Sequence, residues 1–216
     1  MRLTRPSLRP LLVATVVVAS LWMGEATYAA SVTGYPVPTP ASYPTSITTG
    51  PDGRVWFTEQ VSSKIGRIAP SGAIREFPPP TPGAHTWGIT TGPDRNLWFT
   101  EPLRASIGRI TPDGTINEFP LPPGARAFGI ALGPDGAVWF ADSGRGAIGR
   151  ITTMGSVLEY PLPTSHAGLL WITPGPEGNL WFTENVANQI GRITLQHGRR
   201  AVARATPTPG RWGRPG

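Results

Sequence analysis

The sequence predicts an all-β protein, a β-propeller of about four recognisable four-stranded blades, and three observations support this fold class. A segment close to Gly-Pro-Asp-Gly-x-x-Trp-Phe-Thr-Glu occurs four times, and its tryptophans are 42, 41 and 42 residues apart (Trp56, Trp98, Trp139 and Trp181). Glycine and proline recur in every unit, and they would break the helices of a helical repeat. Val55 and Phe57 alternate with Trp56 and Thr58, the period-2 pattern of a strand with two distinct faces. Four strands in about 42 residues make a propeller blade, with a stacked β-solenoid as the alternative.

Residues 1–29 are predicted to be a secretory signal peptide. Arg2, Arg5 and Arg9 give a positively charged start, and the apolar run over residues 11–22 is too short to span a membrane as a helix. Small residues precede an expected cleavage site after Ala29. We therefore expect a secreted or extracytoplasmic protein with no membrane span after cleavage, and an uncleaved membrane anchor is the alternative.

Residues 30–196 are predicted to form the blades. In the first unit, strands are expected around residues 46–48, 54–59, 64–68 and 73–77, and equivalent runs recur in the later units. The Gly-Pro-Asp-Gly segment supplies proline and aspartate at early turn positions and glycine where a positive φ is needed, so it favours a tight turn. An Ile-Gly-Arg-Ile segment begins nine residues after each tryptophan and supplies the third strand.

The two ends of the chain are expected to differ from the repeat. Residues 35–40 resemble the end of a unit, residues 77–82, which predicts the outer strand of a blade that another segment completes. Residues 197–216 form a basic Gly/Pro/Arg tail that we expect to be disordered. Either the fourth outer strand is degenerate, or the reading frame is lost near Leu195. A propeller must close to cover its end blades, and dimerisation is one way to complete it.

Composition excludes several classes of protein. The chain has no cysteine, which rules out a disulfide scaffold, a zinc–thiolate site and a cysteine nucleophile. Its net charge is +6, but residues 1–29 contribute +2 and residues 197–216 contribute +5, leaving −1 for residues 30–196. The blades therefore give no charge argument for a nucleic-acid partner.

The repeated text, Trp-Phe-Thr-Glu followed by Ile-Gly-Arg-Ile and Glu-Phe-Pro, resembles the streptogramin B lyase (virginiamycin B lyase) family over about residues 34–196. The resemblance implies a propeller that the family builds from seven blades. It also implies a Mg²⁺-dependent elimination that linearises a cyclic depsipeptide antibiotic at its ester bond, with a histidine as base and glutamates holding the metal. Mg²⁺ prefers oxygen ligands and stabilises the enolate-like charge that forms when the α-proton leaves.

The resemblance also implies positions for the base and the metal ligands. The places that match the family's catalytic histidine carry no histidine: Thr45, Trp87, Phe128 and Leu170. The places that match one metal-binding glutamate carry no carboxylate: Tyr43, His85, Arg126 and Gly168. The second metal-binding glutamate lies shortly after a blade's tryptophan, and the candidates there are Glu59, Glu101 and Glu184, with Asp142 in the third unit.

Positions that differ between blades are the candidate ligand-binding residues. They gather in the linker before each first strand, at the end of the channel where propellers bind ligands: Tyr43, Trp87, Arg126, Phe128 and Trp171. A guanidinium among aromatic rings suits a polar, ring-containing ligand. His85 and His166 in the same linkers are the candidate catalytic bases, with ordinary loop histidines as the alternative.

Positions that repeat in every blade are expected to be structural. The four tryptophans are predicted to pack between blades. The carboxylates that end the second strands form what we call the glutamate column: Glu59, Glu101, Asp142 and Glu184. The arginines of the third strands are predicted to pair with this column or with backbone groups: Arg67, Arg109, Arg150 and Arg192. A ring of carboxylates that binds a divalent cation is the alternative.

Three functions remain open at this point. The first is a Mg²⁺-dependent lyase acting on a small cyclic peptide. The second is a non-catalytic exported propeller that binds a glycan, a peptide, a protein or another cell-envelope ligand. The third is an inactive gene fragment.

Overall fold

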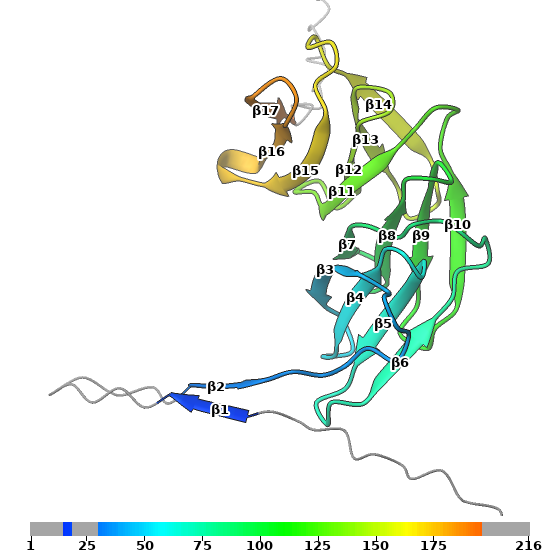
Figure 1. Cartoon of the computed structure of the whole chain (residues 1–216). Helices are drawn as coiled ribbons and strands as arrows, with labels where there is room; N and C mark the ends of the chain where they lie inside the picture. Colours follow the sequence, from blue (N-terminus) through cyan, green and yellow to red (C-terminus); the bar gives the residue numbers. More distant parts are fainter. Residues whose placement is uncertain (1–14, 19–29, 196–216) are drawn as a thin grey trace, which may run out of the picture.

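The computed structural model describes residues 15–18 and 30–195, and its sheets are four successive propeller blades plus one two-stranded sheet (Figure 1). Blade 1 comprises β3 (Pro44–Thr49), β4 (Val55–Glu59), β5 (Lys64–Ile68) and β6 (Ile74–Phe77). Blade 2 comprises β7 (Ile89–Thr91), β8 (Leu97–Glu101), β9 (Ser106–Ile110) and β10 (Ile116–Pro120). Blade 3 comprises β11 (Ala127–Leu132), β12 (Val138–Asp142), β13 (Ala147–Ile151) and β14 (Val157–Pro161). Blade 4 comprises β15 (Leu169–Pro174), β16 (Asn179–Glu184) and β17 (Gln189–Thr194), with a 3-10 turn at Pro176–Gly178. The predicted fold class is confirmed.

The blades are arranged as an open arc (Figure 1). The first strands, β3, β7, β11 and β15, lie along the concave side, and the fourth strands lie along the convex side. Blade 4 shows three strands, and the place of a fourth follows Leu195, where the description ends.

The predicted signal peptide and tail are almost wholly outside this description. Within residues 1–29, only β1 (Thr15–Val18) is described, and it pairs antiparallel with β2 (Ala30–Thr33), away from the blades. Residues 197–216 lie outside the described residues. No helix in the described ranges, 15–18 and 30–195, is both long and apolar enough to cross a membrane.

The Gly-Pro-Asp turn fixes the tryptophan that follows it. In blade 2, Asp94 Oδ1 accepts a hydrogen bond from Trp98 Nε1 at 3.0 Å and another from the backbone N–H of Asn96. Burial acts to raise the pKa of Asp94, but these hydrogen bonds favour the carboxylate and hold the pKa below its usual value. Blade 4 has Glu177 in place of the aspartate, and Trp181 Nε1 finds no partner among the described residues.

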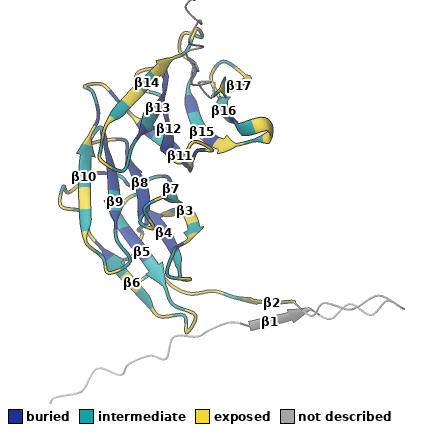
Figure 2. Ribbon diagram, turned by 180° about the vertical axis from the view of Figure 1, so that it is seen from behind, coloured by how far each residue is buried: buried dark blue, intermediate teal, exposed yellow. Residues whose placement is uncertain are grey.

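The hydrophobic core consists of three clusters, one at each interface between neighbouring blades (Figure 2). Trp56, Trp98 and Trp139 are fully buried, and each faces the first and second strands of the next blade. Each of these rings also stacks on the aromatic residue that ends the outer strand of its own blade, as Trp98 does on Phe119 at 5.3 Å. The predicted packing of these tryptophans between blades is therefore what holds the arc together.

The glycine of each Ile-Gly-Arg-Ile strand makes room for the phenylalanine beside it. Gly108 on β9 pairs with Phe99 on β8, and the Phe99 ring lies so close that a β-carbon at position 108 would overlap it. Phe99 is fully buried and belongs to the cluster between blades 1 and 2. A larger side chain at position 108 must therefore displace a core ring.

Gly108→Ala is expected to lower the free energy of unfolding by about 1–3 kcal/mol, the usual cost of overpacking a core. Urea denaturation checks this. Gly34→Ala is the matched control, because nothing lies within 4 Å of a β-carbon there. Equal stability of the two variants would contradict the role assigned to Gly108.

The arginine column corrects one prediction. Arg109 Nη1 lies 3.4 Å from Asp94 Oδ2 and Arg150 Nε lies 2.6 Å from Asp135 Oδ2, so these arginines pair with the turn aspartates and not with the glutamate column. Arg67 and Arg109 also donate to backbone carbonyls of the next blade, Pro112 at 2.6 Å and Thr153 at 3.1 Å. The predicted backbone pairing is correct. The glutamates are the last residues of the second strands, whereas the arginines pair with the tryptophans near the start of those strands. The distance along the strand keeps glutamates and arginines apart.

Candidate functional site

The linkers before the first strands and the turns after the second strands lie at one end of the blades. This follows from the antiparallel register, in which Ala127 pairs with Asp142 and Leu169 pairs with Glu184. Between blades 3 and 4 these segments enclose a hollow of about 460 Å³. Its walls include Arg126, Phe128, Ser143, Leu170, Asn185 and Val186.

A local irregularity in the first strand presents Phe128 to this end. The pairing of β11 with β12 shifts register between Ala127 and Ile130, as in a β-bulge. Thr100 of blade 2 replaces part of the missing ladder, because its Oγ1 donates to the carbonyl of Phe128 at 2.7 Å. The Phe128 ring meets the ring of Trp87 edge to face, with centroids 5.3 Å apart. Phe128 therefore packs the linker of blade 3 against the linker of blade 2.

Arg126 is held by its backbone and leaves its side chain exposed. Its N–H donates to Asp142 Oδ1 at 2.8 Å, and the same oxygen accepts from the N–H groups of Gly144 and Arg145. Burial raises the pKa of Asp142, although these three hydrogen bonds act in the other direction. Arg126 also borders a second hollow of about 450 Å³ beside Leu103. The guanidinium thus stands between two concave surfaces.

The structure does not bring the other predicted ligand-binding residues into this hollow. Tyr43 belongs to the blade 1 linker and is 63% exposed, and Trp171 on β15 is 45% exposed. Trp87 contacts the hollow only through Phe128, and its Nε1 is buried without a hydrogen-bond partner. Arg126 and Phe128 are therefore the two predicted residues that line the same concavity.

The two candidate histidines occupy different places in different blades. His85 lies at the linker position that Tyr43 and Arg126 hold in blades 1 and 3, whereas His166 lies two positions earlier in its unit. Both have positive φ, 55° and 54°, which is uncommon for residues other than glycine. The linker of blade 3 separates them along the arc, so they do not form one catalytic group.

A buried carboxylate recurs at this end of every blade. Glu59, Glu101, Asp142 and Glu184 are each at most 4% exposed, and each has one carboxylate oxygen without a hydrogen-bond partner. Burial raises the pKa of Glu59, and it raises the pKa of Glu101 to about 7. Charged groups this deeply buried are costly, so these carboxylates predict a pH dependence of stability.

These carboxylates do not fit the Mg²⁺ site that the resemblance implies. Over residues 30–195, no three His, Asp or Glu side chains come together to hold a metal ion. Each glutamate lies in a different blade, and its unpaired oxygen is closed off from solvent, whereas Mg²⁺ keeps several waters. Metal binding by Glu59, Glu101 and Glu184 stays a prediction.

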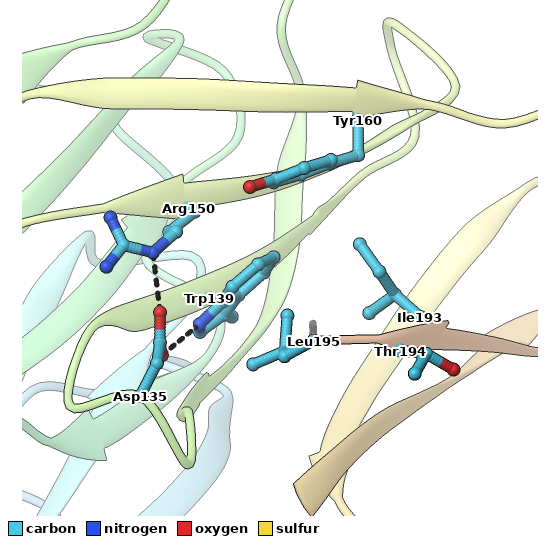
Figure 3. Close-up of a pocket in the computed structure, with 7 residues that line it drawn as sticks. All are labelled: Asp135, Trp139, Arg150, Tyr160, Ile193, Thr194 and Leu195. Atoms are coloured by element: carbon cyan, nitrogen blue, oxygen red, sulfur yellow. Dashed lines mark hydrogen bonds and ion pairs between the residues drawn. The ribbon is translucent and has the colours of Figure 1, made fainter. Parts of the chain in front are cut away.

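Another concavity, lined by residues of blades 3 and 4, has a structural explanation (Figure 3). Its walls include Trp139, Arg150, Tyr160 and Leu195, and Asp135 binds both Trp139 and Arg150. At the equivalent place between blades 2 and 3, the outer hairpin around Thr153 receives the hydrogen bond from Arg109. The equivalent place in blade 4 falls after Leu195, outside the described residues. This concavity is therefore part of a blade interface.

Sequence reasoning missed the turns that follow the second strands. Ser143 and Asn185 line the hollow from these turns, together with Val186. The signal was present, because these turns differ between blades just as the linkers do. Only the register of the first two strands shows that turn and linker share one end.

The fold defines the class of protein as a β-propeller, with a loop-lined hollow between blades 3 and 4. The chain matches the Virginiamycin B lyase family over residues 13–209, and it belongs to that family. It is similar to virginiamycin B lyase from Staphylococcus aureus, with 45% identity and a TM-score of 0.74 over 78% of this chain and 57% of that one.

Two further solved structures extend the comparison. One is a catalytically inactive variant of the Staphylococcus aureus enzyme with quinupristin, with 45% identity and a TM-score of 0.73 over 78% of this chain and 57% of the other. The second is a streptogramin B lyase, with 40% identity and a TM-score of 0.70 over 78% of this chain and 59% of that one. The chain thus spans less than two thirds of these relatives. Curated proteins give no match.

Proposed function

We propose that this chain binds a cyclic depsipeptide of the streptogramin B class at the hollow between blades 3 and 4. The observation that carries the proposal is the joint lining of one concavity by the exposed guanidinium of Arg126 and the ring of Phe128. A guanidinium donates to the carbonyl oxygens of a peptide ring, and an aromatic wall packs on its apolar side chains. A similar protein has been crystallised with quinupristin, which supports this ligand class.

Arg126→Ala is expected to weaken quinupristin binding about tenfold, which corresponds to losing one hydrogen bond from a charged donor. Isothermal titration calorimetry without added metal measures the dissociation constant. Arg75→Ala is the matched control, because Arg75 is also exposed but lies on β6 of blade 1. Equal affinity of the two variants would contradict the assigned site.

The second candidate function is the Mg²⁺-dependent lyase reaction, which the 45% identity to a virginiamycin B lyase favours. Elimination removes the α-proton, breaks the alkyl carbon–oxygen bond of the ester and forms a carbon–carbon double bond, with a carboxylate as leaving group. The reaction needs a base, and the matching places in the described blades carry Thr45, Trp87, Phe128 and Leu170. The geometry therefore supports binding more directly than catalysis.

Liquid chromatography with mass spectrometry separates the two functions. Elimination opens the quinupristin ring without changing its mass, whereas hydrolysis adds the mass of one water. Incubation with MgCl₂, for the chain and for its His85→Ala and His166→Ala variants, tests both candidate bases. Binding without a ring-opened product would leave the non-catalytic propeller as the function. Export remains the prediction made from residues 1–29.

A further inference from the structure

The hollow beside Leu103 lies at the same end of the blades, between blades 2 and 3, and we call it the blade 2–3 hollow. The turn after β8 supplies one wall with Leu103 and Arg104, and the linker before β11 supplies the other with Arg126. The two walls are joined, because the N–H of Leu121 donates to the carbonyl of Ala105 at 2.7 Å. The lining residues include two arginines and, within the described part of the chain, no carboxylate.

Arg104 is anchored through part of its guanidinium. Its Nε and Nη2 donate to the carbonyl of Pro82 at 3.0 and 2.6 Å, and its backbone N–H donates to the carbonyl of Glu101 at 3.0 Å. A guanidinium carries about five N–H donors, so the two bonds to Pro82 use fewer than half of them. The side chain is exposed. Arg104 is therefore held in place while most of its donors stay available to a ligand.

The next blade shows how an arginine at this place is neutralised. Arg145 lies three residues after the carboxylate that ends the second strand of blade 3, as Arg104 does in blade 2. It also donates to a linker carbonyl, that of Pro123, at 3.1 Å. In addition, its Nε bonds both carboxylate oxygens of Glu159 on β14, at 3.1 and 2.8 Å. The charge of Arg145 is thus matched within its own blade.

Blade 2 lacks this neutralisation. Glu118 on β10 holds the place of the blade 3 glutamate, but it accepts from the N–H and Oγ1 of Thr81. The ion pairs between described residues include neither Arg104 nor Arg126. Asp142 binds only the backbone N–H of Arg126 and leaves its guanidinium without a carboxylate. The blade 2–3 hollow therefore carries two cationic groups whose charge no described carboxylate contacts.

We propose that the blade 2–3 hollow binds the carboxylate of a linear peptide between the guanidinium groups of Arg104 and Arg126. Guanidinium groups recognise carboxylates through paired, charge-assisted hydrogen bonds. Leu103 is 48% exposed and offers an apolar surface to the neighbouring side chain of the peptide.

This site distinguishes the open form of a depsipeptide from the closed ring. Opening the ring at its ester frees a carboxylate that the closed ring does not have, and the hollow supplies the cations that bind it. The inference rests on the proposed function for its choice of peptide. It assigns a different hollow, which shares only Arg126 with the hollow between blades 3 and 4.

Two forms of one linear peptide isolate the contribution of the carboxylate. Quinupristin hydrolysed at its ester by alkali gives a linear acid, and conversion of the freed carboxyl group to an amide removes the charge. Isothermal titration calorimetry measures both ligands with the full chain. We expect the acid to bind about tenfold more tightly than the amide, and less so as NaCl is raised, because salt screens exposed charges. Equal affinity of the acid and the amide would overturn the proposal.

Arg104→Gln tests the residue that only the blade 2–3 hollow uses. We expect the preference for the acid over the amide to fall at least about threefold, because one of two charge-assisted partners is lost. Arg145→Gln is the matched control, since it also loses a linker contact but removes a charge that Glu159 already neutralises. Circular dichroism verifies that both variants fold. An equal loss of preference in the two variants would overturn the proposal.

The proposal for each hollow can fail without the other. Binding of intact quinupristin reports on the hollow between blades 3 and 4, and Arg104→Gln should leave it unchanged because Arg104 does not line that hollow. A parent chain that binds the linear acid but not the intact ring would contradict the first site and support the second. A parent chain that binds the intact ring but not the linear acid would overturn the second site alone.

Discussion

Trp98→Ala is expected to lower the free energy of unfolding by about 3–5 kcal/mol, the usual cost of removing a large buried aromatic side chain. Trp98 is fully buried in the cluster between blades 2 and 3, stacks on Phe119 and donates its indole N–H to Asp94. Its removal leaves a cavity and deprives the Asp94 carboxylate of one of its hydrogen-bond donors. Urea denaturation followed by circular dichroism measures the loss.

Trp171→Ala is the matched control for this prediction. Trp171 is 45% exposed, so its removal empties no closed core and should cost less than about 1 kcal/mol. A similar loss for the two variants would show that the clusters between blades are not the main source of stability.

Stability is expected to fall as the pH rises from about 5 to 7, and Glu101 is the largest single cause. Glu101 is fully buried, Ser106 donates to one of its oxygens at 2.6 Å, and the other oxygen has no partner. Burial raises its pKa from 4.5 to about 7 in the folded chain. The folded state therefore holds a proton that the unfolded state has lost, and this stabilisation disappears as the pH passes the folded pKa. The change amounts to about 3 kcal/mol for this group.

Glu101→Gln is expected to flatten this dependence and to raise stability at pH 8 relative to the parent chain. Urea titrations at pH 5, 6, 7 and 8 give the slope. Glu59 and Asp142 have raised pKa values from burial as well, so a smaller slope should remain. Glu177→Gln changes an exposed glutamate in a turn and should leave the slope unaltered. A parent chain with the same stability at pH 5 and pH 8 would refute the assignment.

How well the sequence predicted the site depends on how far apart in the chain the contacting residues lie. The linker residues Arg126 and Phe128 were identified because they break the repeat, and both line the hollow. Tyr43 breaks it too but belongs to blade 1, whose linker does not line this hollow. Trp171 directly follows Leu170, which does line the hollow, so blade position alone does not explain its absence. Ser143 and Asn185 were overlooked because their turn meets the linker only through strand register.

The sequence by itself determined the repeat, the strands and the glycine and proline turns, because these depend on neighbours within one unit. It also indicated that Trp98 and its equivalents are core residues. Tertiary structure decided that Arg67 reaches the carbonyl of Pro112, 45 residues away. It also decided that the ion pairs between described residues include none of Glu59, Glu101 and Glu184. It alone showed that Ile47 and Ile190 are exposed while their equivalents are buried. A local pattern is the same in every blade, but burial depends on whether a neighbouring blade is present.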